Sequence, residues 1–283
     1  MSDNGFPEPA PKPLTPQEQA KPYAKYYTMD LGEPNLEALE LLRRDRQVDQ
    51  EQMLMPEDLN KLLDPGNFEV ETGWGMMDNG AGYIAMRHEM PGVTVEMIDW
   101  WFAWHPLEPL RYRIWYPPYH LGIGLDDWAR PRLLDPDVPA REKCSHVIHH
   151  VSEDTGMGTE YIEIHFLTPE EMGFDMSRWH APNVGTFVGG FGFSTFEQQP
   201  PGMPAAPAIM CHFVREMQGG VEWRTRFWMG YTIMNGRPVC MLPPGVRVPE
   251  GVPHGLANHN VHEYGRLKAL LPLVYSELGG TYA

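Results

Sequence analysis

The chain has 283 residues, 42% of them hydrophobic and 21% charged, as in an ordinary globular protein with room for a core and a cavity. A net charge of −16 without any basic stripe excludes nucleic acid and anionic membranes as expected partners. No apolar run of about 18 residues and no signal-peptide pattern occur, and Cys144, Cys211 and Cys240 form no CxxC pair, so we expect reduced thiols in a cytoplasmic protein.

The N-terminal region predicts extra helices ahead of the main fold. Residues 1–25 are rich in Pro and polar side chains, and we expect a mobile arm or a strap over the surface. Residues 26–283 are then a single domain. Leucines at helical spacing predict an amphipathic helix over residues 34–48, with Asn35 as its cap.

The middle of the chain mixes both kinds of element. Residues 82–90 predict a strand, and Thr94 caps a predicted helix that ends near Trp104. Residues 111–116 predict a short strand between proline-rich loops. Residues 125–141 contain many Asp, Pro and Arg residues, which predicts a loop.

The second half predicts β-structure closed by one long helix. Residues 217–221 predict a hairpin turn between two long strands, and the last helix begins near His254 and has about 20 residues. A run of antiparallel strands before a C-terminal helix predicts an α+β fold, in which a curved sheet wraps on the helix around a cavity. The predicted strands cover residues 143–154, 160–169, 184–195, 208–218 and 221–233.

The last helix has a pattern typical of metal ligands. His259 and Glu263 are four residues apart, so they lie on one face of the helix, one turn from each other. An imidazole and a carboxylate held in this way suit a divalent metal such as zinc. The same spacing also occurs on solvated helix faces, and His262 is an alternative to either residue.

Two further ligand candidates lie upstream. His120 follows a rigid turn of aromatic residues and prolines that would hold its ring in place. Alternation along residues 160–169 puts Glu163 and His165 on one face and Ile162 and Ile164 on the other. A carboxylate and an imidazole on one face are either solvated or line a polar cavity. His146, His149 and His150 form another cluster, for which a surface position is the simpler interpretation.

Several segments resemble the 2,4-diacetylphloroglucinol hydrolase family, which includes phloretin hydrolase. They are WWFAWHPLEPLRYRIWYPPYH, RTRFWMGY and the terminal helix with HNVHE, and the resemblance covers most of residues 80–275. It implies a helix-grip fold of the Bet v 1 type. It also implies a zinc-dependent hydrolase that cleaves the carbon–carbon bond between an acyl group and a phenolic ring. The implied partner is a small phenolic acyl substrate, and a homodimer is a further implication.

The resemblance implies two His and two Glu as zinc ligands. Carried over to this chain, they are His120, Glu163, His259 and Glu263. Glu160 stands three residues before Glu163 and is the alternative for the ligand on the strand.

The resemblance also implies residues that bind the substrate. Tyr112 stands eight residues before His120, as a substrate-binding tyrosine does in the family. Arg226 and Tyr231 are further pocket candidates, and His212 is a candidate general acid or a core histidine. The polar residue that the family has shortly after its first His ligand is missing here.

These residues suggest a mechanism. Zinc would activate water or polarise the carbonyl, Tyr112 would donate a hydrogen bond, and Glu163 or Glu263 would act as base. Two other functions stay open at this stage. A carrier of hydrophobic ligands would hold no metal and would leave the His259 and Glu263 pair exposed, and a zinc lyase or cyclase acting on a polyketide would keep the metal.

Overall fold

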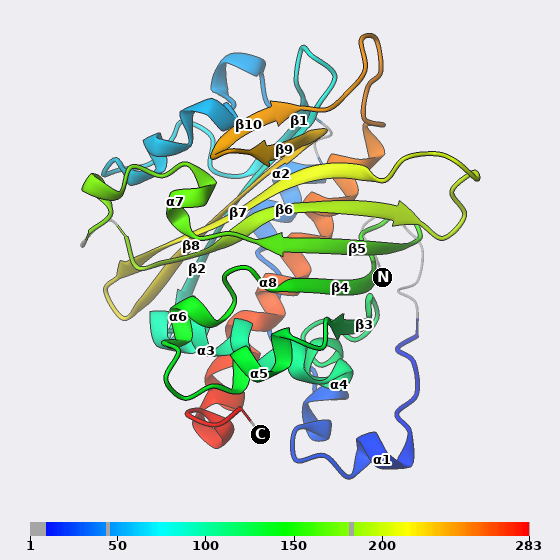
Figure 1. The fold of residues 1–283 in the computed structure, drawn as a ribbon, viewed down its shortest axis with the longest axis vertical. Helices are drawn as coiled ribbons and strands as arrows, with labels where there is room; N and C mark the ends of the chain where they lie inside the picture. Colours follow the sequence, from blue (N-terminus) through cyan, green and yellow to red (C-terminus); the bar gives the residue numbers. More distant parts are fainter. Residues whose placement is uncertain (1–9, 44–45, 181–183, 283) are drawn as a thin grey trace.

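The computed structural model describes residues 10–43, 46–180 and 184–282. In this part of the chain, eight antiparallel strands form one curved sheet in the order β1-β2-β8-β7-β6-β5-β4-β3, and β9 pairs with β10 apart from it (Figure 1). The strands are β1 (Gly73–Met76), β2 (Gly82–Pro91), β3 (His120–Leu125), β4 (Ile148–Asp154), β5 (Thr159–Phe166), β6 (Thr186–Phe196), β7 (Ala206–Met217), β8 (Gly220–Met229), β9 (Tyr231–Met234) and β10 (Arg237–Cys240).

Short helices join and flank these strands, and one long helix ends the chain. The α-helices are α1 (Pro16–Gln19), α2 (Leu36–Arg43), α3 (Val95–Trp104), α4 (Pro109–Arg113), α5 (Ala129–Leu134), α6 (Ala140–Lys143), α7 (Pro169–Met172) and α8 (Gly251–Leu278). The 3₁₀ turns are η1 (Ala24–Tyr27), η2 (Gln50–Gln52), η3 (Pro56–Leu63), η4 (His105–Leu107) and η5 (Met176–Arg178). None of the helices within the described ranges has both the length and the apolar character needed to cross a membrane.

Helix α8 passes behind the strands of the large sheet, as Figure 1 shows. It begins at Gly251, three residues before the predicted start, and has 28 residues. Leu267, Leu271 and Val274 of this helix are fully buried in the cluster that also contains sheet residues such as Trp223. The predicted α+β fold, with a curved antiparallel sheet wrapped on a C-terminal helix, is confirmed.

Strand alternation divides the core between two faces of the sheet. In β7, Met210 and Val214 belong to the cluster that contains α8, whereas Cys211 and Phe213 belong to a second cluster. We call the side facing α8 the inner face and the opposite side the outer face. Because side chains alternate along a strand, residue parity decides which face each one occupies.

The N-terminal segment lies against the body of the protein as a strap. Glu18 forms an ion pair with Arg113 at 2.6 Å, and the ring of Tyr23 packs edge-on against Trp104 at 5.3 Å. Both contacts are made by residues of the predicted arm, whose residues 1–9 lie outside the described residues. The division into an N-terminal arm over residues 1–25 and a single domain over residues 26–283 stays a prediction.

Helix α2 is shorter than predicted. Asn35 caps it as expected, because the Ala38 N–H donates to its Oδ1 atom at 3.1 Å. The helix ends at Arg43, residues 44–45 are outside the described residues, and residues 46–48 are not helical. The prediction that the helix continues to residue 48 is wrong.

Two predictions for the middle of the chain are also wrong. Residues 111–116 were predicted to be a strand, but α4 occupies Pro109–Arg113. Pro109 stands in the first turn, where its missing N–H costs nothing, and the Ile114 N–H donates to the Leu110 carbonyl at 2.9 Å. Residues 125–141 are not all loop, because α5 and part of α6 form there.

The last predicted strand is two strands. Residues 221–233 were predicted to be continuous, but the backbone turns at Gly230, where φ is +98°. A residue with a side chain rarely adopts this conformation. Strands β8 and β9 on the two sides of Gly230 consequently belong to different sheets. The predicted hairpin turn before β8 is confirmed.

Candidate active site

A cavity lies between the inner face of the sheet and helix α8. Its volume is about 140 Å³, close to that of an engineered apolar cavity of about 150 Å³ that binds benzene. Ile164, Met210 and Phe227 form apolar walls, and Leu256 closes the side of the helix. One end is polar. The cavity therefore accommodates about one aromatic ring beside a set of ionisable side chains.

Three ligand-type side chains meet at the polar end of this cavity. His259 and Glu263 lie one turn apart on α8, with 3.7 Å between Nε2 and Oε2. His120 approaches from β3, and its Nε2 lies 3.4 Å from the same Glu263 oxygen. One donor atom from each residue lies within 4.8 Å of the other two. The structure thus brings together three of the four predicted ligands.

The aromatic turn places His120 as the sequence suggested. The backbone N–H of His120 donates to the Tyr116 carbonyl at 2.8 Å, which closes the turn just before β3. His120 Nδ1 lies 3.3 Å from the Tyr112 carbonyl, an acceptor, so Nδ1 carries the proton. The Nε2 lone pair is therefore free to face the carboxylates, as a metal-binding imidazole requires.

A fourth donor, Glu153, was missed by the sequence analysis. It is the register partner of His120 in the β3–β4 pair, and its Oε2 lies 3.7 Å from His120 Nε2. Glu153 stands near the end of a strand beside other polar residues, where carboxylates are usually solvated. The alternation of side chains along β4 would have identified Glu153, because it lies on the same strand face as the buried Val151 and His149.

Glu163 does not join this group, which corrects the predicted ligand set. It lies on the outer face of β5, where its side chain is 47% exposed and 2.6 Å from His165. Glu160 lies on the inner face, is 4% exposed and accepts a hydrogen bond from Thr155. The predicted alternation is right, but the cavity is on the face with Ile162 and Ile164.

Burial controls the protonation of this group. Desolvation, reinforced by His259, holds the pKa of His120 well below its ordinary value, and desolvation lowers the pKa of His259 to about 3. Desolvation and repulsion by Glu160 raise the pKa of Glu153 to about 7. Desolvation and the nearby Glu153 also raise the pKa of Glu263 well above its usual range. Neutral imidazoles beside destabilised carboxylates favour a bound cation.

The residues present fit a divalent metal ion. Nε2 of His120 is buried and has no hydrogen-bond partner among the described residues. A buried polar atom without a partner costs about 1–3 kcal/mol, and coordination would remove that cost. Two imidazole nitrogens and two carboxylates also match the donor types of catalytic zinc sites.

Tyr112 is held against the donor group. Its ring stacks on the His120 ring with 4.1 Å between centroids and 0° between planes, and its hydroxyl donates to Glu153. Desolvation and the charge of Glu153 raise the pKa of Tyr112 well above its ordinary value. Tyr112 therefore keeps its proton and acts as a hydrogen-bond donor at the cavity wall.

His212 lies on the inner face of β7 and lines the same cavity. Its Nδ1 is 2.9 Å from the Thr225 hydroxyl, and its Nε2 is 3.2 Å from the Tyr264 hydroxyl. Desolvation and the nearby His88 lower the pKa of His212 to about 3. The ring is therefore neutral and belongs to a buried hydrogen-bond network that reaches the cavity.

Two predicted pocket residues lie elsewhere, which corrects those predictions. Arg226 is on the outer face of β8, fully buried, where it pairs with Glu71 at 2.6 Å. Tyr231 is in β9 and binds Asn79 through its hydroxyl at 2.6 Å. Neither residue lines the cavity. In β8 the side chains of Thr225, Phe227 and Met229 point to the inner face. Because side chains alternate along a strand, Arg226 points to the outer face and cannot line the cavity.

The other predicted histidines are accounted for separately. His262 is not part of the donor group found among the described residues, and its Nδ1 lies 2.9 Å from the Asn258 carbonyl. His146 and His150 pair with surface carboxylates, and His146 lies before β4 rather than in it. His149 instead points inward and lines the cavity. So does His105, whose Nδ1 is 2.8 Å from the Trp101 carbonyl.

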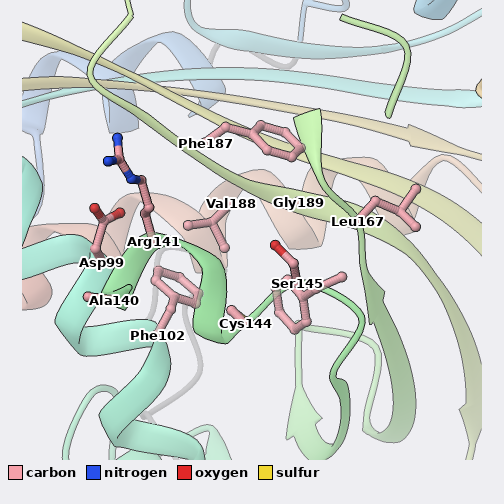
Figure 2. A pocket seen from close by; sticks show the side chains of 11 residues that line it. Asp99, Phe102, Ala140, Arg141, Cys144, Ser145, Leu167, Phe187, Val188 and Gly189 are labelled. Carbon is pink, nitrogen blue, oxygen red and sulfur yellow. The ribbon is translucent and has the colours of Figure 1, made fainter. Parts of the chain in front are cut away.

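A second, smaller cavity lies beside α3 and α6 (Figure 2). Its volume is about 20 Å³, enough for about one water molecule. Asp99, Arg141 and Cys144 contribute to its lining, and Phe102 and Phe166 separate it from the larger cavity. It is too small to hold a phenolic substrate.

Comparisons with known proteins identify the family of this chain. A family model described as the DAPG hydrolase PhiG domain matches residues 54–276. Phloretin hydrolase from Eubacterium ramulus is 33% identical over 269 residues, which cover 94% of this chain and 93% of that protein. A 2,4-diacetylphloroglucinol hydrolase from Pseudomonas sp is 27% identical over 277 residues, covering 92% and 89%.

The solved structures that match this chain have low sequence identity to it. The structure of Ara h 8.0201 is 10% identical, with a TM-score of 0.36, and the match covers 70% of this chain and 100% of that one.

Proposed function

The chain belongs to the family of the DAPG hydrolase PhiG domain, and we propose that it hydrolyses the carbon–carbon bond between an acyl group and a phenolic ring. The reaction consumes one water molecule. The acyl carbon takes the hydroxyl group and becomes a carboxylic acid, and the ring carbon takes a proton. The main observation behind this proposal is the buried donor group at the end of a cavity that fits about one ring.

We propose that His120, Glu153, His259 and Glu263 hold one zinc ion. The short distances among their donor atoms and the partnerless Nε2 of His120 support this assignment. A zinc ion bound there would supply Lewis-acid chemistry, which polarises a carbonyl and lowers the pKa of water. Iron, manganese or cobalt would also accept these donors, so the metal identity rests on the comparison of donor types.

Tyr112 is proposed to orient the substrate. Its hydroxyl lies beside the donor group, keeps its proton and donates it to Glu153; once Glu153 binds the metal, the same proton would turn to an oxygen of the acylated ring. Charge develops on the substrate oxygens as the bond breaks, and a fixed donor stabilises that charge more than the ground state. The stack on His120 holds the ring of Tyr112 in place for this role.

Proton transfer is assigned to two places on the cavity wall. Glu160 is buried in the wall of the same cavity, and desolvation raises its pKa, so its carboxylate is a stronger base than an exposed one. Glu160 thereby replaces Glu163 in the predicted role of base. His212 on β7 and Tyr264 on α8 form a hydrogen-bonded pair that could deliver a proton to the ring carbon.

The cavity also bears on the substrate. The named relatives act on phloretin and on 2,4-diacetylphloroglucinol, which share an acylated polyhydroxy ring. A volume of about 140 Å³ holds about one ring, so a small acyl group fits with less rearrangement than a long one. We propose a phloroglucinol-type ring as the substrate core.

The two alternative functions are less well supported. A carrier of hydrophobic ligands would leave the helix pair exposed, but His259 is 7% exposed and Glu263 is 9% exposed. A lyase or cyclase would suit the same donor group, but the named relatives are hydrolases. The cytoplasmic location and the homodimer stay predictions.

One experiment tests the proposed function. The purified protein is incubated with 2,4-diacetylphloroglucinol, with phloretin and with an aryl ester as a control for non-specific acyl hydrolysis. We expect the ring and the carboxylic acid to appear in equal amounts from at least one ketone, and elemental analysis to find about one zinc per chain. We expect the His259→Ala variant to lose both the bound zinc and the formation of products. Neither product from any acylphenol, with zinc present, would overturn the assigned reaction.

A further inference from the structure

A hydrogen-bonded chain runs from strand β2 to the metal-binding group through two residues that the proposed reaction does not use. Nε2 of His88 lies 2.8 Å from Oδ1 of Asn260, and Nδ2 of Asn260 lies 3.3 Å from Oε1 of Glu263. His88 is 5% exposed and Asn260 is 1% exposed. Within the described residues, Asn260 is the hydrogen-bond donor to the Glu263 carboxylate.

The chain of bonds has a fixed direction. A carboxylate that binds a metal is ionised and only accepts hydrogen bonds, so in the metal-bound site the NH₂ group of Asn260 faces Glu263 and the carbonyl oxygen faces His88, as the two distances also indicate. That oxygen is an acceptor, which requires the proton of His88 to be on Nε2. Desolvation lowers the pKa of His88 to about 4, so the ring is neutral and carries one ring proton. His88 therefore sets the orientation of the Asn260 amide.

Packing fixes His88 in turn. Its ring stacks on Tyr264 with 5.1 Å between centroids and 15° between planes. Tyr264 is one helical turn after Asn260, just as Glu263 is one turn after His259. Helix α8 therefore presents two adjacent ridges, one with the ligands and one that anchors them to the sheet.

We propose that His88, acting through Asn260, is a positioning residue that holds the Glu263 carboxylate in its metal-binding orientation. This inference rests on the metal site of the proposed function and goes beyond it. Without the donor at position 88, the amide can rotate and place its oxygen against the carboxylate, which also lies near Glu153. Partners of this kind typically change metal affinity by about 10- to 100-fold.

The test measures zinc affinity of the apoprotein by competition with a chromophoric chelator, with no activity needed. His88→Phe keeps a ring to stack on Tyr264 but removes the donor, and we expect zinc affinity to fall about tenfold or more. His88→Gln keeps an N–H donor at similar reach, and we expect affinity within about threefold of wild type. Asn260→Leu should lose as much as His88→Phe.

Three further measurements separate positioning from folding. Tyr264→Phe removes a hydroxyl on the same ridge that binds His212 and not Glu263, so zinc affinity should stay within about twofold. Combining His88→Phe with Asn260→Leu should cost no more than Asn260→Leu alone, because both act through one bond. Thermal unfolding of each apoprotein reports any general loss of stability.

Each result is decisive. Unchanged affinity in His88→Phe, or an equal loss in His88→Gln, would overturn the inference, because the donor would then not matter. If His88→Phe does not fold, unchanged affinity in Asn260→Leu would overturn it in the same way. A wild-type protein that binds no zinc would instead remove the metal assignment itself, and this result differs from the others.

Discussion

The Nε2 atom of His120 lies 3.4 Å from Oε2 of Glu263, although one residue begins the edge strand β3 and the other is in the C-terminal helix. The curvature of the sheet around α8 brings these two elements together. Glu153 reaches the same point because β4 is the neighbour of β3. The site is therefore assembled at the sheet edge, where one strand pair faces one turn of helix.

The first prediction separates the two candidate strand carboxylates. Glu153→Gln should weaken zinc binding at least tenfold, since it removes the charge of a proposed ligand. Glu163→Gln is the matched control, and its zinc content should equal that of wild type, because Glu163 is on the outer face. Elemental analysis after dialysis measures both. Zinc loss in Glu163→Gln alone would restore the ligand set predicted from sequence.

The second prediction concerns Tyr112. Tyr112→Phe keeps the ring that stacks on His120 and removes the hydroxyl that donates to Glu153. We expect kcat to fall about 100-fold, as for loss of one preorganised donor, with zinc content retained. Steady-state kinetics on an acylphloroglucinol provide the measurement. An unchanged kcat would assign Tyr112 to packing alone.

The third prediction concerns Asp99, which lines the small cavity in Figure 2. Desolvation raises the pKa of Asp99 from 3.8 to about 6, and the Thr186 hydroxyl donates to it at 2.6 Å. The folded state thus binds this proton more tightly than the unfolded state does. Wild-type stability should therefore fall as pH rises from about 4 to about 6, by roughly 3 kcal/mol at most.

Asp99→Asn tests that dependence. Its amide oxygen can still accept from Thr186, but the side chain has no charge to desolvate. Urea unfolding of both proteins at pH 4 and pH 7 measures the difference between them, so that other titrating groups cancel. We expect the variant to gain stability relative to wild type at the higher pH. A pH-independent difference would show that Asp99 has an ordinary pKa.

The fourth prediction concerns the buried arginines on the outer face. Glu71 pairs with Arg224 and Arg226 at 2.6 Å each, and both arginines are at most 1% exposed. Glu71→Gln leaves two buried charges without a counterion, and we expect a loss of about 3 kcal/mol in unfolding free energy. Glu69→Gln, at an exposed site, should change little. Equal stabilities in denaturant unfolding would contradict the prediction.

The comparison of sequence with structure is most instructive for strand β5. Alternation correctly placed Glu163 and His165 on one face of this strand and Ile162 and Ile164 on the other. Which face meets the cavity depends on how the sheet curves around α8, and period-two spacing does not carry that information. A buried carboxylate on the apolar face was the better candidate, because the apolar residues mark the inner face.

The same distinction applies to β8. Its start and its hairpin turn were predictable from local residue types, but its end before Gly230 was not, and the direction of Arg226 depended on the register with β2 and β7. From the sequence, a basic residue among aromatic residues of one strand suggested that Arg226 lines a pocket. Its partner Glu71 is far away in sequence, so only the folded chain reveals the ion pair.

The sequence by itself determined the elements whose signals are local. These are the capped helix after Thr94, the strands bounded by turns, the long C-terminal helix and the His259 and Glu263 pair, whose geometry one helical turn fixes. The tertiary structure alone decided that Glu153 joins His120, that Glu163 faces outward and that His88 reaches Glu263 through Asn260. The physical reason is that these relations depend on sheet register and curvature, which arise from contacts between residues far apart in the chain.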